Sequence, residues 1–210
     1  MDLKVYFSER PVAALVLAHG AGAGQMSEFM VQAARGFAAR GVTTATFDFP
    51  YITAGRKIPD RAPVLERAWC DAIDAARTEI RDLPLFIGGK SMGGRIASQV
   101  AAQGGKEPVR GLVFLGYPLH PPGRPEQRRD AHLPAIREPM LFVQGGKDAF
   151  GNAAEIRALL PTLQQATLHE IAGGDHSFKV PGGKAKQEPV FSNILDTVVE
   201  WMRSTVARGK

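Results

Sequence analysis

The fold of this chain is decided by one stretch, LFIGGKSMGG at residues 85–94. Residues 85–88 have the composition of a short buried strand, and residues 92–103 have the apolar spacing of a helix. The turn between them fits the pattern G-x-S-x-G, with Gly89 and Gly93 on either side of Ser91. A serine in such a strained turn needs close neighbours that lack a Cβ. The stretch therefore predicts Ser91 as a nucleophile held above the carboxyl edge of a sheet.

Outward from this stretch, short apolar runs alternate with longer amphipathic runs. The pattern predicts further strands at residues 3–8, 12–18, 42–49, 111–116, 139–144 and 166–171, and further helices at 26–40, 64–81, 152–160 and 190–206. This order indicates an α/β fold, a mostly parallel sheet of about six to seven strands with helices on both faces. Because no repeat or linker divides the chain, we expect a single domain over residues 1–210.

Composition excludes several classes of protein. The single cysteine, Cys70, rules out a disulfide framework and zinc-finger spacing, and it favours a cytoplasmic setting. No apolar stretch approaches the length of a membrane span, so no membrane association is expected. The net charge is +5, but lysines and arginines are scattered, so no nucleic-acid partner is expected. A weak preference for anionic ligands remains open.

Two nucleotide-binding motifs are also excluded. A P-loop ending at residues 89–91 would need glycine where Pro84 stands, and the strand-to-helix loop is too short to cradle phosphates. The glycines near residue 20 do not extend to G-x-G-x-x-G, because Gln25 occupies the last position. No cofactor and no metal are therefore expected.

A glycine-rich loop, HGAGAG at residues 19–24, directly follows the first buried strand. Small residues there let the backbone approach a substrate carbonyl. We expect the N–H of Ala21 to bind the oxyanion, with Gly22 as the next candidate and a substrate contact. The N–H of Met92, at a helix N-terminus, is the expected partner donor. His19 is interpreted as a side chain that fixes this loop by hydrogen bonding.

A serine hydroxyl needs a base and an orienting carboxylate. Along the chain, the nucleophile is expected first, then the carboxylate and then the histidine. Asp148 follows the strand 139–144, and His176 follows the strand 166–171, each in a glycine-rich turn. Asp175 adjoins His176 but should point elsewhere, and Asp48 lies too early in the chain. The other histidines, His120, His132 and His169, are interpreted as surface, lid or strand residues.

The surroundings of the predicted site leave alternatives open. Residues 117–138 carry five prolines without periodicity, which fits either a lid or an irregular connection. The aromatic residues Tyr51, Tyr117, Phe150 and Phe178 can form an apolar substrate wall or ordinary packing. Arg95 follows the nucleophile by one helical turn, and its side chain is expected on the helix surface.

At four motifs the chain resembles a known superfamily. LAHGAGAG at 17–24, FDFPY at 47–51, GGKSMGGR at 88–95 and DHSF at 175–178 resemble a small, capless, dienelactone-hydrolase-like α/β-hydrolase. More narrowly, they resemble the branch grouped with testis-expressed and NSL-complex regulatory-subunit-like hydrolase domains. The resemblance implies a Ser91–Asp148–His176 triad and a fold without a large cap domain. Dienelactone hydrolases proper carry a cysteine nucleophile, so the resemblance does not extend to their substrate.

Three functions are compatible with these residues. The first is a serine hydrolase that cleaves an ester, thioester or related acyl bond of a small molecule. The second is a non-catalytic hydrolase-like binding module, because some members of the narrower branch serve as interaction domains. The third is a serine peptidase or acyltransferase, which nothing in the sequence separates from an esterase. The physiological substrate and the oligomeric state are left open.

Overall fold

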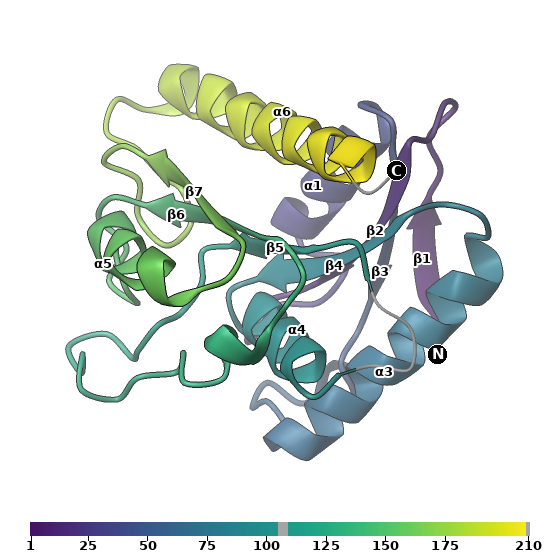
Figure 1. Cartoon of the computed structure of the whole chain (residues 1–210), viewed down its shortest axis with the longest axis horizontal. Helices are drawn as coiled ribbons and strands as arrows, with labels where there is room; N and C mark the ends of the chain where they lie inside the picture. Colours follow the sequence, from purple (N-terminus) through teal and green to yellow (C-terminus); the bar gives the residue numbers. More distant parts are fainter. Residues whose placement is uncertain (105–108, 209–210) are drawn as a thin grey trace.

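The sheet predicted from the sequence is present. The structure is a computed structural model that describes residues 1–104 and 109–208. Its strands are Leu3–Tyr6 (β1), Ala13–Ala18 (β2), Val42–Phe47 (β3), Leu85–Lys90 (β4), Leu112–Leu115 (β5), Met140–Gly145 (β6) and Ala166–Ile171 (β7). They form one sheet in the order β1-β3-β2-β4-β5-β6-β7 (Figure 1). β1 runs antiparallel to β3, and the other neighbours pair in parallel, which confirms the α/β prediction.

Helices cover both faces of the sheet. They are Glu28–Ala38 (α1), Pro50–Thr53 (α2), Ala62–Glu79 (α3), Met92–Ala102 (α4), Ala153–Leu159 (α5) and Lys184–Arg208 (α6). α1 and α6 pack on one face, and α3, α4 and α5 pack on the other (Figure 1). β2 divides its side chains accordingly, because successive residues of a strand point to opposite faces. Ala14 and Val16 join one core, while Leu15 and Leu17 join the other.

Several predicted boundaries differ from the observed ones, and two of these differences involve proline. β3 ends at Phe47 rather than at residue 49, because Phe49 caps the short helix α2, whose first residue is Pro50. α2 was not predicted. α6 begins at Lys184 rather than at residue 190, with Pro189 inside it. Pro189 is the sixth residue of α6, where it lacks only its own N–H hydrogen bond, and the helix continues through it.

The irregular segment 117–138 is packed against the body of the molecule. Leu119, Leu133 and Ile136 are fully buried in the core beside α4 and α5. A short 3₁₀ turn, Leu133–Ala135, interrupts it and contacts α4. These anchors favour a fixed connection over a mobile lid. Among the described residues, no separate cap is inserted between the strands, and no helix is long and apolar enough to cross a membrane.

Candidate active site

The predicted site residues converge at the carboxyl edge of the sheet. His19 follows β2, Ser91 follows β4, Asp148 follows β6 and His176 follows β7. Because these strands are parallel, their carboxyl ends lie at the same edge, which is where open α/β sheets bind ligands. The structure brings Ser91, Asp148 and His176 into direct contact across this edge.

Ser91 occupies a strained turn. Its backbone has φ 51° and ψ −117°, a conformation that L-residues seldom adopt. Two close approaches hold the turn. A Cβ on Gly89 would lie 2.6 Å from the carbonyl carbon of Gly93, and a Cβ on Gly93 would lie 2.5 Å from the carbonyl oxygen of Ala18. Glycine at both positions therefore lets the start of α4 pack directly on β2 and β4, as the sequence pattern predicted.

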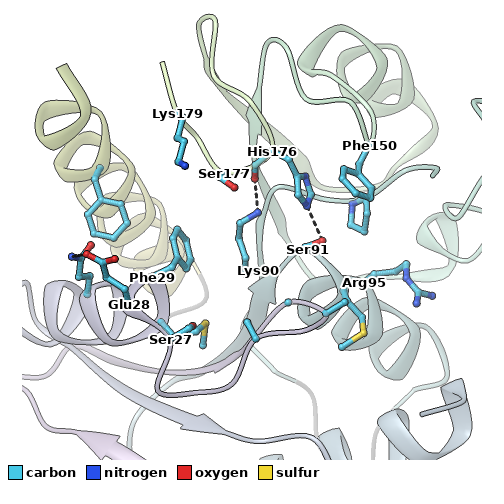
Figure 2. A pocket seen from close by; sticks show the side chains of 18 of the residues that line it. Ser27, Glu28, Phe29, Lys90, Ser91, Arg95, Phe150, His176, Ser177 and Lys179 are labelled. Carbon is cyan, nitrogen blue, oxygen red and sulfur yellow. Dashed lines mark hydrogen bonds between the residues drawn. The ribbon is translucent and has the colours of Figure 1, made fainter. Parts of the chain in front are cut away.

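A continuous hydrogen-bonded chain links three side chains. The distance from His176 Nε2 to Ser91 Oγ is 2.8 Å, and that from His176 Nδ1 to Asp148 Oδ2 is 2.7 Å (Figure 2 shows the serine–histidine contact). Because a carboxylate only accepts, Nδ1 carries the proton and donates it to Asp148. Nε2 is then free to accept the hydroxyl proton of Ser91. This arrangement can activate a serine hydroxyl.

Asp148 is buried and held from two further directions. Its Oδ2 also accepts from Gln144 Nε2 at 2.9 Å, and its Oδ1 accepts from the backbone N–H of Phe150 at 2.8 Å. The Phe150 ring packs on the imidazole of His176, with ring centroids 4.3 Å apart. The ring and the carboxylate together fix the orientation of the histidine.

The other candidate acids have different partners. Asp175 Oδ1 accepts from the backbone N–H groups of Ser177 and Lys179, so it stabilises the turn that carries His176. Asp48 Oδ1 accepts from the backbone N–H of Gln25 at 2.7 Å and lies 3.6 Å from His19 Nε2. Neither carboxylate has a hydrogen bond to His176.

Two amides beside Ser91 are available to a ligand. Within the described ranges, the N–H groups of Met92 and Ala21 have no hydrogen-bond acceptor, and both residues line the cavity described below. The N–H of Gly22 donates instead to the hydroxyl of Tyr51 at 3.3 Å. Ala21 and Met92 are thus positioned as a pair that can receive an oxyanion, while Gly22 is already engaged.

His19 fixes the loop that carries Ala21. It is fully buried, its Nδ1 lies 2.8 Å from the carbonyl oxygen of Gly20, and its Nε2 lies 3.2 Å from the backbone nitrogen of Phe49. The imidazole therefore donates through Nδ1 and accepts through Nε2, which requires the neutral form. Burial lowers the pKa of His19, in agreement with that form. His19 ties the loop after β2 to the loop after β3.

Comparison with known proteins identifies the family. The family model of the alpha/beta hydrolase domain matches residues 11–203. The chain belongs to this alpha/beta hydrolase family.

Solved structures of low sequence identity share the fold of this hydrolase. A dienelactone hydrolase from Anabaena variabilis has a TM-score of 0.74 and 22% identity, and the match covers 95% of this chain and 89% of that chain. XC6422 from Xanthomonas campestris, described as an a/b serine hydrolase without lid, has a TM-score of 0.71 and 19% identity. The match covers 99% of this chain and 88% of that chain. The polyketide synthase ThaQ from Burkholderia thailandensis is 37% identical over 79 residues, which are 38% of this chain and 4% of that protein.

The hydrolase has a cavity of about 1380 Å³ that contains Ser91 and His176 (Figure 2). Phe150, one of the four aromatic residues predicted to contact substrate, lines it. Tyr51, Tyr117 and Phe178 do not; they are fully buried in packing positions.

Both tyrosine hydroxyls bind backbone groups. The Tyr117 hydroxyl donates to the carbonyl oxygen of Arg129 at 2.9 Å, while the Tyr51 hydroxyl accepts from Gly22. Burial raises the pKa of both phenols. These two side chains therefore stabilise the loops of the site through backbone hydrogen bonds and do not line the cavity.

Sequence reasoning did not place Arg95 and Lys90, among other cationic residues, on the cavity wall. Arg95, expected on the helix surface, is half-buried and lines the cavity. Lys90 also lines it, between the rings of Phe29 and Phe178, with Nζ 5.9 Å and 5.2 Å from their centroids. Lys90 Nζ donates to the carbonyl oxygen of His176 at 2.5 Å. Burial lowers its pKa to about 8, against the opposing effect of Asp148 and Asp175.

This shift predicts a pH-dependent stability. The pKa of Lys90 is lower in the folded chain, about 8, than its ordinary value of 10.5, so the unfolded chain binds more protons between these pH values. The free energy of unfolding of the wild type, relative to a Lys90→Met variant, should therefore rise by about 3 kcal/mol from pH 8 to pH 10.5. Urea unfolding of both proteins across this range measures it. A constant difference between the two proteins would contradict the prediction.

Proposed function

We propose that this alpha/beta hydrolase is a serine hydrolase that cleaves an ester, a thioester or a related acyl bond of a small molecule. The observation that carries the proposal is the hydrogen-bonded chain from Ser91 through His176 to Asp148, beside two unengaged backbone N–H groups. Nucleophile, base and orienting carboxylate are all present at hydrogen-bond distances, which is what acyl transfer through a serine requires.

The proposed reaction has two halves. Ser91 Oγ attacks the acyl carbon, His176 Nε2 takes the hydroxyl proton, and the N–H groups of Met92 and Ala21 bind the oxyanion. The bond to the leaving group breaks, and His176 returns the proton to that group. Water then attacks the acyl-enzyme, giving one proton to Nε2 and its hydroxyl to the acyl carbon, and Ser91 recovers its proton as the acid departs. Asp148 stabilises the imidazolium in both halves.

The cavity supports a substrate of small or medium size. It is open to solvent, without a separate cap among the described residues, and both apolar and charged side chains line it. Esterases and a dienelactone hydrolase are among the proteins that share this fold, which supports acyl-bond cleavage as the reaction class. Membership of the narrower testis-expressed and NSL-like branch stays a prediction.

Covalent labelling tests the proposal. A fluorophosphonate probe should modify the wild type at one site, and peptide mass spectrometry should locate the label on Ser91. Ser91→Ala should abolish labelling. Ser177→Ala is the matched control, because Ser177 lines the same cavity but lies outside the hydrogen-bonded chain, and this variant should still be labelled. A folded wild type that takes no label would favour the non-catalytic binding module, and persistent labelling of Ser91→Ala would reject Ser91 as the nucleophile.

A further inference from the structure

Arg95 and Arg129 are among the arginines of the cavity wall that form no ion pair with the described residues. Arg95 lies on α4 one turn after Ser91, and its backbone N–H donates to the carbonyl oxygen of Ser91 at 3.1 Å. Its guanidinium makes one hydrogen bond, from Nη1 to Gln99 Oε1 at 3.3 Å, while its Nε is buried without any partner. Arg129, from the loop after β5, lines the same cavity. Across residues 1–104 and 109–208, neither guanidinium forms an ion pair.

The two arginines affect each other electrostatically. Ser98 Oγ donates to the carbonyl oxygen of Arg95 at 2.6 Å and lies 3.4 Å from the Tyr117 hydroxyl, which donates to the carbonyl oxygen of Arg129, so the two arginines are close in space. Burial lowers the pKa of Arg95 and the positive charge of Arg129 also lowers it, while Tyr117 and Glu66 raise it. Unpaired, partly desolvated like charges are unfavourable unless an anion lies between or beside them. Their proximity is therefore explained most directly by a ligand that brings a negative charge.

Nearby carboxylates are engaged elsewhere. Asp130 pairs with Arg128 through both of its oxygens, and Glu66 accepts from Gln103 Nε2 at 3.0 Å. Asp60, a carboxylate on the cavity wall, pairs with Arg56 through Oδ1 at 2.8 Å, while its Oδ2 is buried without a hydrogen-bond partner. None of these carboxylates forms an ion pair with Arg95 or Arg129, although Glu66 acts on Arg95 at longer range and raises its pKa. Among the described residues no carboxylate contacts either guanidinium, so direct contact with a negative group is left to a ligand.

Arg95 lies close to Ser91 along α4. Figure 2 shows Arg95 on the same side of Ser91 as Phe150, with Lys90 and Phe29 on the opposite side. One helical turn separates Arg95 from Ser91, a rise of about 5.4 Å along the axis. Because Arg95, Arg129 and Ser91 line the same cavity, a negative group held by the arginines would belong to the molecule that Ser91 attacks.

We propose that Arg95 and Arg129 form a subsite for a carboxylate or phosphate group carried by the substrate. Guanidinium groups match the geometry of both oxyanions and bind them through charge-assisted hydrogen bonds. The proposal rests on the proposed function and narrows its substrates to acyl compounds with an anionic group close to the scissile bond. The apolar part of the cavity wall would then contact the uncharged part of the substrate.

Matched esters test the subsite. The neutral probe is 4-nitrophenyl butyrate, and 4-nitrophenyl hydrogen glutarate carries a carboxylate on the acyl side. For the leaving-group side, the probes are phenyl butyrate and its 4-carboxy and 4-phosphate derivatives. We expect the wild type to prefer at least one anionic probe over its neutral partner by about tenfold in kcat/KM, chiefly through KM. The preferred probe distinguishes carboxylate from phosphate.

Variants assign the preference to these side chains. Arg95→Gln and Arg129→Gln should each lower the anionic-to-neutral ratio by about tenfold, and Arg95→Lys should restore part of it. Arg124→Gln removes an exposed charge from the same loop, outside the cavity lining, and should keep the wild-type ratio. A wild type without anionic preference would overturn the proposal. Equal losses of kcat/KM for anionic and neutral probes in the Arg95 or Arg129 variants would also overturn it. The same holds if Arg124→Gln lowers the anionic-to-neutral ratio by as much as they do.

A binding measurement separates this proposal from the proposed function. The anilide of glutaric acid and butyranilide lack an ester, so calorimetry can compare their affinities without turnover. Tighter binding of the acid, lost in Arg95→Gln, would support an acyl-side subsite even if no ester were hydrolysed. The carboxylate and phosphate of the leaving-group probes are tested in the same way with their amide analogues. Hydrolysis of neutral esters with no anion-dependent binding would overturn the subsite and leave the hydrolase proposal standing.

Discussion

Asp148→Asn is expected to lower kcat for ester hydrolysis by about 10⁴-fold while the chain remains folded. The amide of asparagine has one acceptor and one donor group, whereas Asp148 accepts on both oxygens. If the amide oxygen keeps the hydrogen bond from the Phe150 N–H, its NH₂ faces Gln144 Nε2 and His176 Nδ1. The imidazole can then relieve the conflict only by moving its proton to Nε2. That tautomer directs a proton at Ser91 Oγ and cannot accept one.

Asp175→Asn is the matched control for this substitution. Asp175 adjoins His176 in the sequence, but its Oδ1 only accepts backbone N–H groups, which an asparagine oxygen can still do. We expect its kcat to stay within about threefold of the wild type. Steady-state kinetics with a neutral 4-nitrophenyl ester measure both variants, and thermal unfolding checks that they fold. Similar losses in the two variants would reject Asp148 as the orienting carboxylate.

The sequence predicted the strands, the strand-to-helix turn and the order of the three site residues because each leaves a local pattern. Ser91 is bracketed by glycines, and Asp148 and His176 follow apolar runs at glycine-rich turns. Parallel pairing then brings the ends of these strands to one edge without further information. The strand topology therefore led us to expect contacts among the three side chains.

The cavity wall could not be predicted in the same way, because it depends on contacts between distant segments. Tyr51 and Tyr117 resemble substrate-facing aromatics in the sequence, yet their hydroxyls bind backbone groups 29 and 12 residues away. Arg95 is placed on an exposed helical face by periodicity alone. It becomes a cavity residue because the irregular loop after β5 packs beside α4, where contacts through Ser98 and Tyr117 bring Arg129 near it.

Lys90 illustrates the same limit. In the sequence it is only the variable position of G-x-S-x-G, with no local pattern to assign it a partner. Its ammonium group reaches the carbonyl oxygen of a residue 86 positions later, between two rings from separate parts of the chain. Such a contact follows from the assembled loops and carries no signature in the sequence around Lys90.

Gly93→Ala is expected to destabilise the fold severely, by about 3 kcal/mol or more in the free energy of unfolding. The new Cβ would lie 2.5 Å from the carbonyl oxygen of Ala18 and 2.6 Å from that of His19, and both are backbone atoms at the end of a central strand. α4 cannot easily move away, because the Gly93 carbonyl accepts from Trp69 Nε1 at 3.1 Å. For a chain of this length the expected loss corresponds to a decrease in Tm of about 6–12 °C.

Gly20→Ala separates this steric effect from the general effect of adding a methyl group near the nucleophile. A Cβ on Gly20 would find its nearest neighbours at 3.5 Å and 3.6 Å, on Lys90 and Ser91, which is ordinary van der Waals contact. Its unfolding free energy should stay within about 1 kcal/mol of the wild type. Urea unfolding followed by circular dichroism compares the two variants. If Gly93→Ala were as stable as Gly20→Ala, the start of α4 would have room to shift, and the strained conformation of Ser91 would not depend on glycine at this position.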